Sequence, residues 1–353
     1  MGKGRMGWIE WARALGACGV VLLHVLVSTV LAVEVGTARL VSYATLGIVF
    51  GRWAVPAFFM ITGYLLLDES KHVGWREVRR YVMRMAAVLA TFGLAFALLE
   101  ELWMGLSDPS GLSLVVLWRA VVDVATARTW DHLWYVYALL GVYVFVPSLR
   151  AMQARVGKRG FAIFTVVLCA VVLVVPTFAR LWVTLKGGEV YLYTQGFAAW
   201  GTNVAIGVAN LCVGSCLRDA RLNWKVAVCG TLSLCVMLLV SLWGILGGHG
   251  DCGFVFLQGS CFSCAYAVFV LMLLRRFEGD APVRSGSLVE RLANDSFGIY
   301  VLHPLFVHAV LLGLGAFVVP SPVFEALLFC VSLGGSVLLT HVVRFVPRLG
   351  KLL

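Results

Sequence analysis

The chain has 353 residues, of which 61% are hydrophobic and only 13% are charged. A soluble domain has about 25% charged residues, so this composition excludes a soluble enzyme and a disordered protein. The net charge of +10 does not indicate nucleic-acid binding, because Lys and Arg on an apolar chain are typical of the cytoplasmic edges of a membrane. We therefore expect a polytopic membrane protein that binds no nucleic acid.

Ten apolar segments are each long enough to cross a hydrocarbon core of about 30 Å as a helix. Only helices are considered, because the bilayer core offers no water to unpaired backbone groups. We expect one all-α domain over residues 1–353, with about ten transmembrane helices and a shorter re-entrant or interfacial helix at 112–124. The ten segments are 12–33, 44–67, 82–104, 132–149, 161–182, 197–217, 225–246, 254–274, 296–318 and 323–343.

Lys and Arg are distributed unevenly over the connections between these segments. With the N-terminus placed inside the cell, 22 of the 28 Lys and Arg residues fall on inside segments. The positive-inside rule then predicts that both termini are cytoplasmic, which agrees with an even number of helices. The remaining six are Arg39, Arg52, Arg119, Arg128, Arg180 and Lys186.

The ten cysteines do not indicate a disulfide scaffold, because the chain is neither short nor polar. Most of them lie in apolar runs, where a buried cysteine behaves as a small hydrophobe. Cys212 with Cys216, and Cys261 with Cys264, have metal-like spacings but no partner pair. We therefore expect no metal site.

Arg13 and His24, both in the first segment, are the pair of ionisable residues that most strongly suggests a function. Such side chains inside a membrane span are costly and are functional hypotheses by default. Eleven residues make about three turns, so the two side chains face the same way, roughly 16 Å apart. Arg13 then lies at the inner interface, and His24 lies deep in the bilayer, where a neutral imidazole could act as a general base. The residues alone leave an alternative, in which Arg13 snorkels and His24 makes one interhelical hydrogen bond.

The spacing Arg-x10-His of Arg13 and His24 resembles the hallmark of the acyltransferase-3 family of ten-helix membrane O-acyltransferases. The stretch 52–65 is similar to the second-helix motif of that family, which usually contains Phe-Phe-x-x-Ser-Gly, with Thr62 in place of Ser. Further matches follow at a basic run and in helices four and nine, so the resemblance extends from residue 10 to about residue 306. These further matches are Arg76, Arg79, Arg80 and Arg84, then 132–137 and 296–304.

The resemblance implies transfer of an acyl group, usually acetyl, from cytoplasmic acyl-CoA to a hydroxyl of an envelope carbohydrate. We therefore expect an O-acetyltransferase of the inner (plasma) membrane, surrounded by lipid, with acetyl-CoA as donor. Arg suits the phosphates of coenzyme A because its planar fork gives bidentate hydrogen bonds, although ordinary positive-inside topology also explains a basic run. The residues expected to bind the donor are Arg79, Arg80, Arg84 and His303. For His303 a contact with the product, or a hydrogen bond to a neighbouring helix, is the alternative.

The residues expected to carry catalysis are His24 and Arg13. His24 either takes the proton of the acceptor hydroxyl or is transiently acylated; we favour the general base, although nothing in the sequence separates the two routes. The residues expected to contact the acceptor are Arg52, His132, Trp134 and Tyr300. Each has a structural alternative, such as an aromatic anchor at the membrane interface for His132 and Trp134. His308, His341 and Arg180 match no motif and are interpreted as structural.

Two other functions remain open on the sequence. Membrane-embedded Arg and His also suit a proton-coupled transporter of amino acids or glycans, although we find no repeat between the two halves of the chain. A glycan-export component is the second alternative. The identity of the acceptor, the acyl chain length and the oligomeric state are not predicted.

Overall fold

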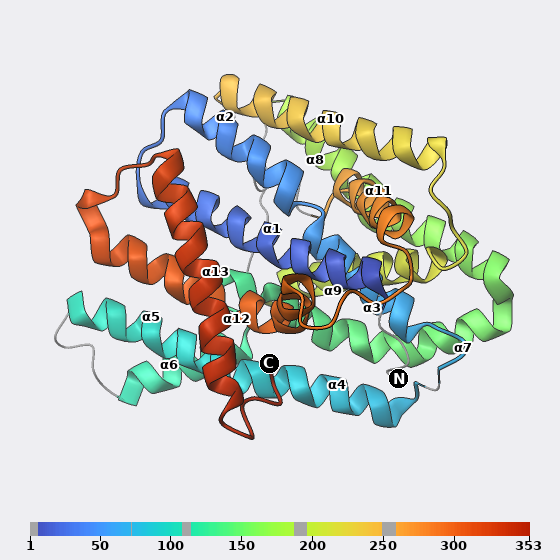
Figure 1. Cartoon of the computed structure of the whole chain (residues 1–353), viewed down its shortest axis with the longest axis horizontal. Helices are drawn as coiled ribbons and strands as arrows, with labels where there is room; N and C mark the ends of the chain where they lie inside the picture. The colour runs from blue at the N-terminus through green and yellow to red at the C-terminus, as the bar shows by residue number, and fades with distance from the viewer. Residues whose placement is uncertain (1–5, 72, 108–113, 187–195, 249–258) are drawn as a thin grey trace.

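The computed structural model describes residues 6–71, 73–107, 114–186, 196–248 and 259–353. Every regular element of these residues is a helix (Figure 1), which confirms the all-α prediction. The α-helices are α1 (Gly7–Ala32), α2 (Thr37–Leu46), α3 (Ala54–Leu66), α4 (Trp75–Val88), α5 (Leu94–Ser107), α6 (Leu114–Ala125), α7 (Trp134–Cys169), α8 (Val175–Leu185), α9 (Gly196–Cys216), α10 (Trp224–Leu246), α11 (Cys261–Glu278), α12 (Leu288–Leu314) and α13 (Pro322–Arg344).

Short π-helical and 3-10 segments join some of these helices. The π-helical segments η1 (Gly47–Gly51), η2 (Leu89–Gly93) and η5 (Ala170–Val174) connect α2 to α3, α4 to α5 and α7 to α8. A 3-10 turn, η4 (Asp131–Leu133), leads directly into α7, and another, η7 (Gly315–Phe317), follows α12. The helical pairs joined by π-helical segments therefore run on as long continuous stretches.

Seven helical stretches among the described residues are long and apolar enough to cross a membrane. The predicted segments 132–149 and 161–182 both fall within one of them, Trp134–Leu185, while 197–217 coincides with α9 and 254–274 overlaps α11. Residues 254–258 lie outside the described residues. The count of ten spans stays a prediction. The seven stretches are Gly7–Ala32, Thr37–Leu66, Trp75–Glu101, Trp134–Leu185, Trp224–Leu246, Leu288–Leu314 and Pro322–Arg344.

Helices α2, α4 and α12 begin well before the apolar segments that predicted them, α2 at Thr37 rather than at 44. The segment starting at 296 belongs to α12, which begins at Leu288 with Ser287 as its N-cap; the Ser287 hydroxyl accepts the backbone N–H of Glu290. The segment starting at 82 belongs to α4, which begins at Trp75. Helices α4 and α12 both start with charged turns, which hydropathy does not detect, although caps and first-turn carboxylates favour helix there.

Gly157 divides the long helix α7 into two. Its φ of 68° and ψ of 176° lie in a region that glycine adopts without the steric cost of a Cβ. The chain therefore turns back at the point between the two predicted segments. Lys158, the next residue, forms a 2.8 Å ion pair with Asp219, which follows α9.

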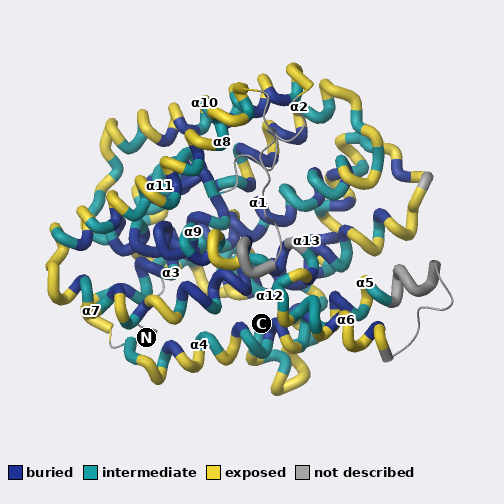
Figure 2. Tube along the Cα trace, turned by 180° about the vertical axis from the view of Figure 1, so that it is seen from behind, coloured by how far each residue is buried: buried dark blue, intermediate teal, exposed yellow. Residues whose placement is uncertain are grey.

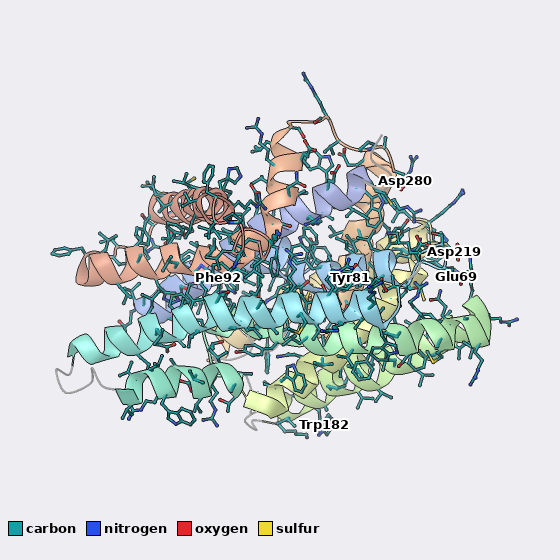
Figure 3. The ribbon with its side chains drawn as sticks, turned by 90° about the horizontal axis from the view of Figure 1, so that it is seen from below. Glu69, Tyr81, Phe92, Trp182, Asp219 and Asp280 are labelled. Atoms are coloured by element: carbon teal, nitrogen blue, oxygen red, sulfur yellow. The ribbon has the colours of Figure 1, made fainter. Side chains whose placement is uncertain are left out.

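Several connections between helices that the charge pattern places on the cytoplasmic side lie at the same end of the molecule. The Trp8 indole at the start of α1 donates a 3.2 Å hydrogen bond to Asp280, which follows α11. Asp219 and Asp280 lie toward the same end in Figure 3, together with Glu69 from the reversal after α3. The fold thus gathers these connections as the positive-inside pattern requires, while the orientation in a membrane stays a prediction.

At the opposite end of the molecule, hydrogen bonds connect the start of α2 to the start of α13. The Arg39 guanidinium donates to the Pro320 carbonyl, and the Tyr43 hydroxyl donates to the Glu325 carboxylate. Both contacts link segments that the charge pattern places outside. The two ends are therefore each tied by polar contacts between elements distant in sequence.

Helix α1 lies in the middle of the bundle and packs against α12, α3, α11, α13 and η1. In Figure 2 the buried stretches gather on α1, α3, α9 and α12, whereas α10 is largely exposed. Helices α3 and α9 approach closely at two glycines, because a Cβ on Gly63 would meet the Leu211 carbonyl and one on Gly214 would meet the Met60 carbonyl. This packing fixes the helices that carry the candidate site.

A polar cavity of about 530 Å³ lies between the reversals after α3 and α9 and the bend of α7. Asp68 and Arg218 form a 2.9 Å ion pair in its wall. Burial tends to raise the pKa of Asp68, but the hydrogen bonds from Ser70 and the charge of Arg218 together lower it. The charges of this pair thus satisfy each other. None of the candidate site residues predicted from the sequence lines this cavity.

Candidate active site

Three histidines from separate parts of the chain meet inside the bundle. His24 comes from α1, His132 from η4 and His303 from α12. His24 Nδ1 and His303 Nε2 lie 2.6 Å apart, within hydrogen-bonding distance, and their rings stack with centroids 4.8 Å apart and planes inclined by 7°. The His132 ring lies edge-on to both, with centroids 6.5 Å from His24 and 5.8 Å from His303. We call these three residues the histidine cluster.

Backbone carbonyls of α12 hold two of the three rings. His303 Nδ1 lies 2.9 Å from the Ile299 carbonyl one turn earlier, and His132 Nε2 lies 3.1 Å from the Val301 carbonyl. In return, the Tyr300 hydroxyl donates to the His132 carbonyl. The short turn η4 is thereby bound to α12 by a hydrogen bond in each direction.

Pro304 frees one further carbonyl of α12 close to the cluster. Proline lacks an N–H, so the Tyr300 carbonyl loses the helical donor that residue 304 would otherwise supply. The His303 ring lies close to this Tyr300 carbonyl. The Ile299 and Val301 carbonyls, which hold the His303 and His132 rings, are not the one that the proline frees.

The three rings differ in how far they can be reached. His303 has no exposed surface and His132 is 5% exposed, whereas His24 is partly exposed. Of the three residues, His24 therefore offers the most surface to a substrate.

Aromatic side chains surround His132 on the side of α5 and η4. Phe96 and Trp130 stack with centroids 4.7 Å apart, and they lie 5.6 Å and 6.1 Å from the His132 ring. Trp130 also contacts His308 of α12, with centroids 4.9 Å apart. Neither Trp130 nor Phe96 stood out in the sequence, because an aromatic residue in an apolar run has no signal of its own.

A second group of rings continues from the cluster toward α3 and α7. Tyr300 lies 6.0 Å from His132 and 5.2 Å from Tyr135 between centroids. Tyr135 lies 4.7 Å from Phe59 and 6.2 Å from Trp134. Tyr300 is thus in the cluster's immediate surroundings, whereas Trp134 reaches it only through Tyr135.

Arg52 is the cation beside the cluster. It lies between η1 and α3, near enough to His24 for its charge to act on that ring. Its Nε is buried without a hydrogen-bond partner among the described residues. A buried guanidinium with an unsatisfied donor is costly, which makes Arg52 a candidate for contact with a ligand.

Arg13 lies on α1 with His24, as predicted, and is partly buried. Its charge acts on Tyr135, whose ring contacts Tyr300. Arg13 is therefore connected to the surroundings of the cluster through Tyr135 and Tyr300.

The three arginines of α4 that were expected to bind the donor have different surroundings. Arg79 and Arg80 are exposed. Arg84 donates to the Leu352 carbonyl through Nε at 3.1 Å, and its guanidinium lies over the Phe297 ring at 5.3 Å. Arg79 and Arg80 are thus accessible for a phosphate ligand, whereas Arg84 already binds the C-terminal segment of the chain.

No three His, Cys, Asp or Glu side chains within the described ranges are placed so that they could hold a metal ion. Two ring nitrogens of the histidine cluster face backbone carbonyls instead. The expectation of no metal site stays a prediction.

The chain matches the sequence model of the acyltransferase-3 family, described as an acyltransferase domain, over residues 6–341. The protein belongs to this family. The match covers the histidine cluster, Arg13, Arg52 and the arginines of α4, so every predicted site residue lies within the acyltransferase domain. No curated protein and no solved structure matches the chain. With its apolar helices, the chain is a membrane acyltransferase.

In this acyltransferase the structure groups the predicted residues differently from the sequence analysis. His303 was expected at the donor, and His132 and Tyr300 at the acceptor. His303 and His132 lie beside His24, and Tyr300 lies beside His132 and His303. The sequence motifs identified each residue, but only the fold brings η4 against α12.

Proposed function

We propose that this acyltransferase moves an acetyl group from cytoplasmic acetyl-CoA to a hydroxyl of an envelope carbohydrate. The observation that carries the proposal is the partly exposed residue His24, whose ring is backed by the buried His303 and lies near an unpaired Arg52 donor. An imidazole beside a cation suits acyl transfer to a hydroxyl.

In the proposed reaction His24 takes the proton of the acceptor hydroxyl while the oxygen attacks the thioester carbon. The tetrahedral intermediate carries a negative oxygen, which Arg52 can stabilise with its free donor. The carbon–sulfur bond then breaks, and the departing thiolate of coenzyme A takes up the proton from His24. Transient acylation of His24 itself is the alternative route.

The donor is proposed to bind through cations at the end of the molecule that is predicted to be cytoplasmic. Arg79 and Arg80 are exposed on α4 and can bind phosphate groups with their planar forks. Arg84 would join them only after releasing Leu352. Arg13, partly buried on α1, lies along the way from this end to His24, which supports its role in guiding the acyl group.

The acceptor is proposed to be a carbohydrate because the cluster is bordered by aromatic rings. Flat apolar faces with polar tips suit a sugar ring, which presents both C–H groups and hydroxyls. Tyr300 and Trp134, predicted from the sequence, belong to this border, and Trp130 and Phe96 extend it. We place the protein in the inner membrane with the carbohydrate reached from the outer side.

The experiment that tests the proposed function follows the fate of labelled acetyl-CoA with purified protein and an envelope extract. We expect label in the carbohydrate fraction with the wild type and none with His24→Ala, because the base is lost. Arg13→Ala is expected to reduce transfer as well. Both variants must accumulate in the membrane like the wild type.

Two outcomes would contradict the proposed function. Label that enters the extract equally with His24→Ala would remove His24 from catalysis. Accumulation of a solute in vesicles without acyl-CoA, combined with no acetyl transfer by the wild type, would favour the proton-coupled transporter instead.

A further inference from the structure

We propose that His303 is a positioning residue that holds His24 in a single tautomer, with the proton on Nδ1 and the catalytic lone pair on Nε2. The inference rests on the proposed function and assigns His303 a role other than the donor contact expected from the sequence. It follows from a chain of three groups: the Ile299 carbonyl, the His303 ring and the His24 ring.

The chain begins at an acceptor whose role is fixed. A backbone carbonyl can only accept, so the 2.9 Å contact between His303 Nδ1 and the Ile299 oxygen requires a proton on Nδ1. In a neutral imidazole the other nitrogen is then an acceptor. His303 Nε2 therefore accepts, and its 2.6 Å partner, His24 Nδ1, must donate. The lone pair of His24 lies on Nε2.

The neutral form of His303 is the one that adds no further charge to the site. Among the described residues, ionisable groups that act on the His24–His303 pair include Arg52, His132 and His308. None of them is an anion, and Arg52 already places one cation beside His24. A second buried cation without a counter-ion would be costly.

Nε2 is the nitrogen of His24 that His303 leaves free for a substrate. Nδ1 of His24 points to His303, which has no exposed surface, while His24 as a residue is partly exposed. When Nε2 takes the hydroxyl proton, the resulting imidazolium still donates its Nδ1–H to His303. This is the role that a buried carboxylate has in a serine–histidine–aspartate triad, here filled by a neutral ring.

Both nitrogens of His303 are thus occupied by protein groups. His303 cannot hydrogen-bond to acetyl-CoA without breaking one of them. The inference therefore separates two roles by their kinetics: a donor contact affects the KM for acetyl-CoA, whereas a positioning residue affects kcat.

The test compares His303→Leu with His303→Gln in lipid nanodiscs. Leucine removes the acceptor, and we expect kcat to fall on the order of 10²-fold with little change in the KM for acetyl-CoA. The glutamine carbonyl reaches the position of Nε2 and can accept from His24 Nδ1, so we expect it to restore most of kcat. Histidine ring ¹⁵N NMR is expected to show His24 protonated at Nδ1 in the wild type and in His303→Gln, but not uniformly in His303→Leu.

His341→Leu is the matched control, because it also removes an imidazole that hydrogen-bonds at α12. His341 Nε2 lies 2.9 Å from the Asp295 carboxylate, outside the histidine cluster. We expect this variant to keep both kcat and the His24 tautomer, although it loses a contact between α12 and α13.

A wild type whose His24 carries its proton on Nε2 would overturn the inference, as would His303→Leu with an unchanged kcat. A raised KM with an unchanged kcat would return His303 to the donor site. Failure of the proposed function would give a different result, because the wild type would then transfer no acetyl group. The NMR measurement of the His24 tautomer would still test the inference about His303 in that case.

Discussion

Single residues of the site divide into those that face a ligand and those that face the protein. His24 is partly exposed, whereas both nitrogens of His303 and one nitrogen of His132 face groups of the protein. Arg52 belongs to the first class, because its Nε has no partner within the described part of the chain. The distinction assigns binding and chemistry to His24 and Arg52, and positioning to the rings behind them.

Replacing Arg52 tests whether its free donor acts on the reaction. We expect Arg52→Leu to lower kcat about 10²–10³-fold, the size of the effect of losing one oxyanion donor. Arg52→Lys is expected to keep the positive charge but to lose the planar guanidinium with its paired donors, so it should recover activity only in part. Steady-state transfer kinetics with accumulated protein measure this, and an active Arg52→Leu enzyme would show that the guanidinium is structural.

The site residues were predictable from the sequence one at a time, but their grouping was not. Arg13, His24 and His303 stood out because ionisable groups in apolar helices are rare and because they match family motifs. His132 was assigned to the end of a helix, and it lies in η4, directly before α7. Its place near His24 depends on Tyr300 and the Val301 carbonyl, which bind η4 to α12. A hydrogen bond between residues about 170 positions apart leaves no local pattern.

At the level of elements, the close approach of α3 and α9 depends on glycine. Gly214 of α9 lies so near the Met60 carbonyl that an added Cβ would collide with backbone, which cannot move aside like a side chain. Gly201 of the same helix has nothing within 4 Å of an added Cβ. Replacing each glycine by alanine therefore distinguishes the effect of close packing, at Gly214, from the effect of helix propensity alone, at Gly201.

We expect Gly214→Ala to destabilise the protein by about 1–3 kcal/mol through overpacking. Gly201→Ala is expected to be neutral or slightly stabilising, since alanine is the better helix former. Thermal unfolding in detergent measures both. Equal melting temperatures for Gly214→Ala and the wild type would mean that α3 and α9 are not packed as closely as described.

The boundaries of the helices were predicted less accurately from the sequence than their apolar interiors. Hydropathy located all the long apolar helices, because their interiors are uniformly apolar. It missed the first turns of α4 and α12, since residues such as Glu77 and Glu290 are charged but lie at favourable helix starts. It also could not place Gly157 as a bend, because the bend requires a backbone conformation rather than a polar run.

At the scale of the whole molecule, the fold gathers the basic connections at one end and the α12–α13 connection at the other. Cysteine labelling with a membrane-impermeant maleimide tests this polarity in intact cells. We expect Asp219→Cys and Asp280→Cys to react only after permeabilisation, because they share the end predicted to be cytoplasmic. Phe317→Cys, in η7 at the opposite end and 85% exposed, is expected to react without it.

The wild type supplies the labelling background of the native cysteines. Labelling of Asp219→Cys and Phe317→Cys from the same side would contradict the predicted topology. It would also remove the argument that the arginines of α4 face a cytoplasmic donor.

The account as a whole depends on His24 acting in acyl transfer. The most direct measurement is kcat for acetyl transfer by His24→Ala in lipid nanodiscs, with folding verified by thermal unfolding. We predict a loss on the order of 10²–10⁴-fold, the usual contribution of a general base, with acetyl-CoA still bound. A His24→Ala enzyme that is folded and as active as the wild type would contradict the central claim.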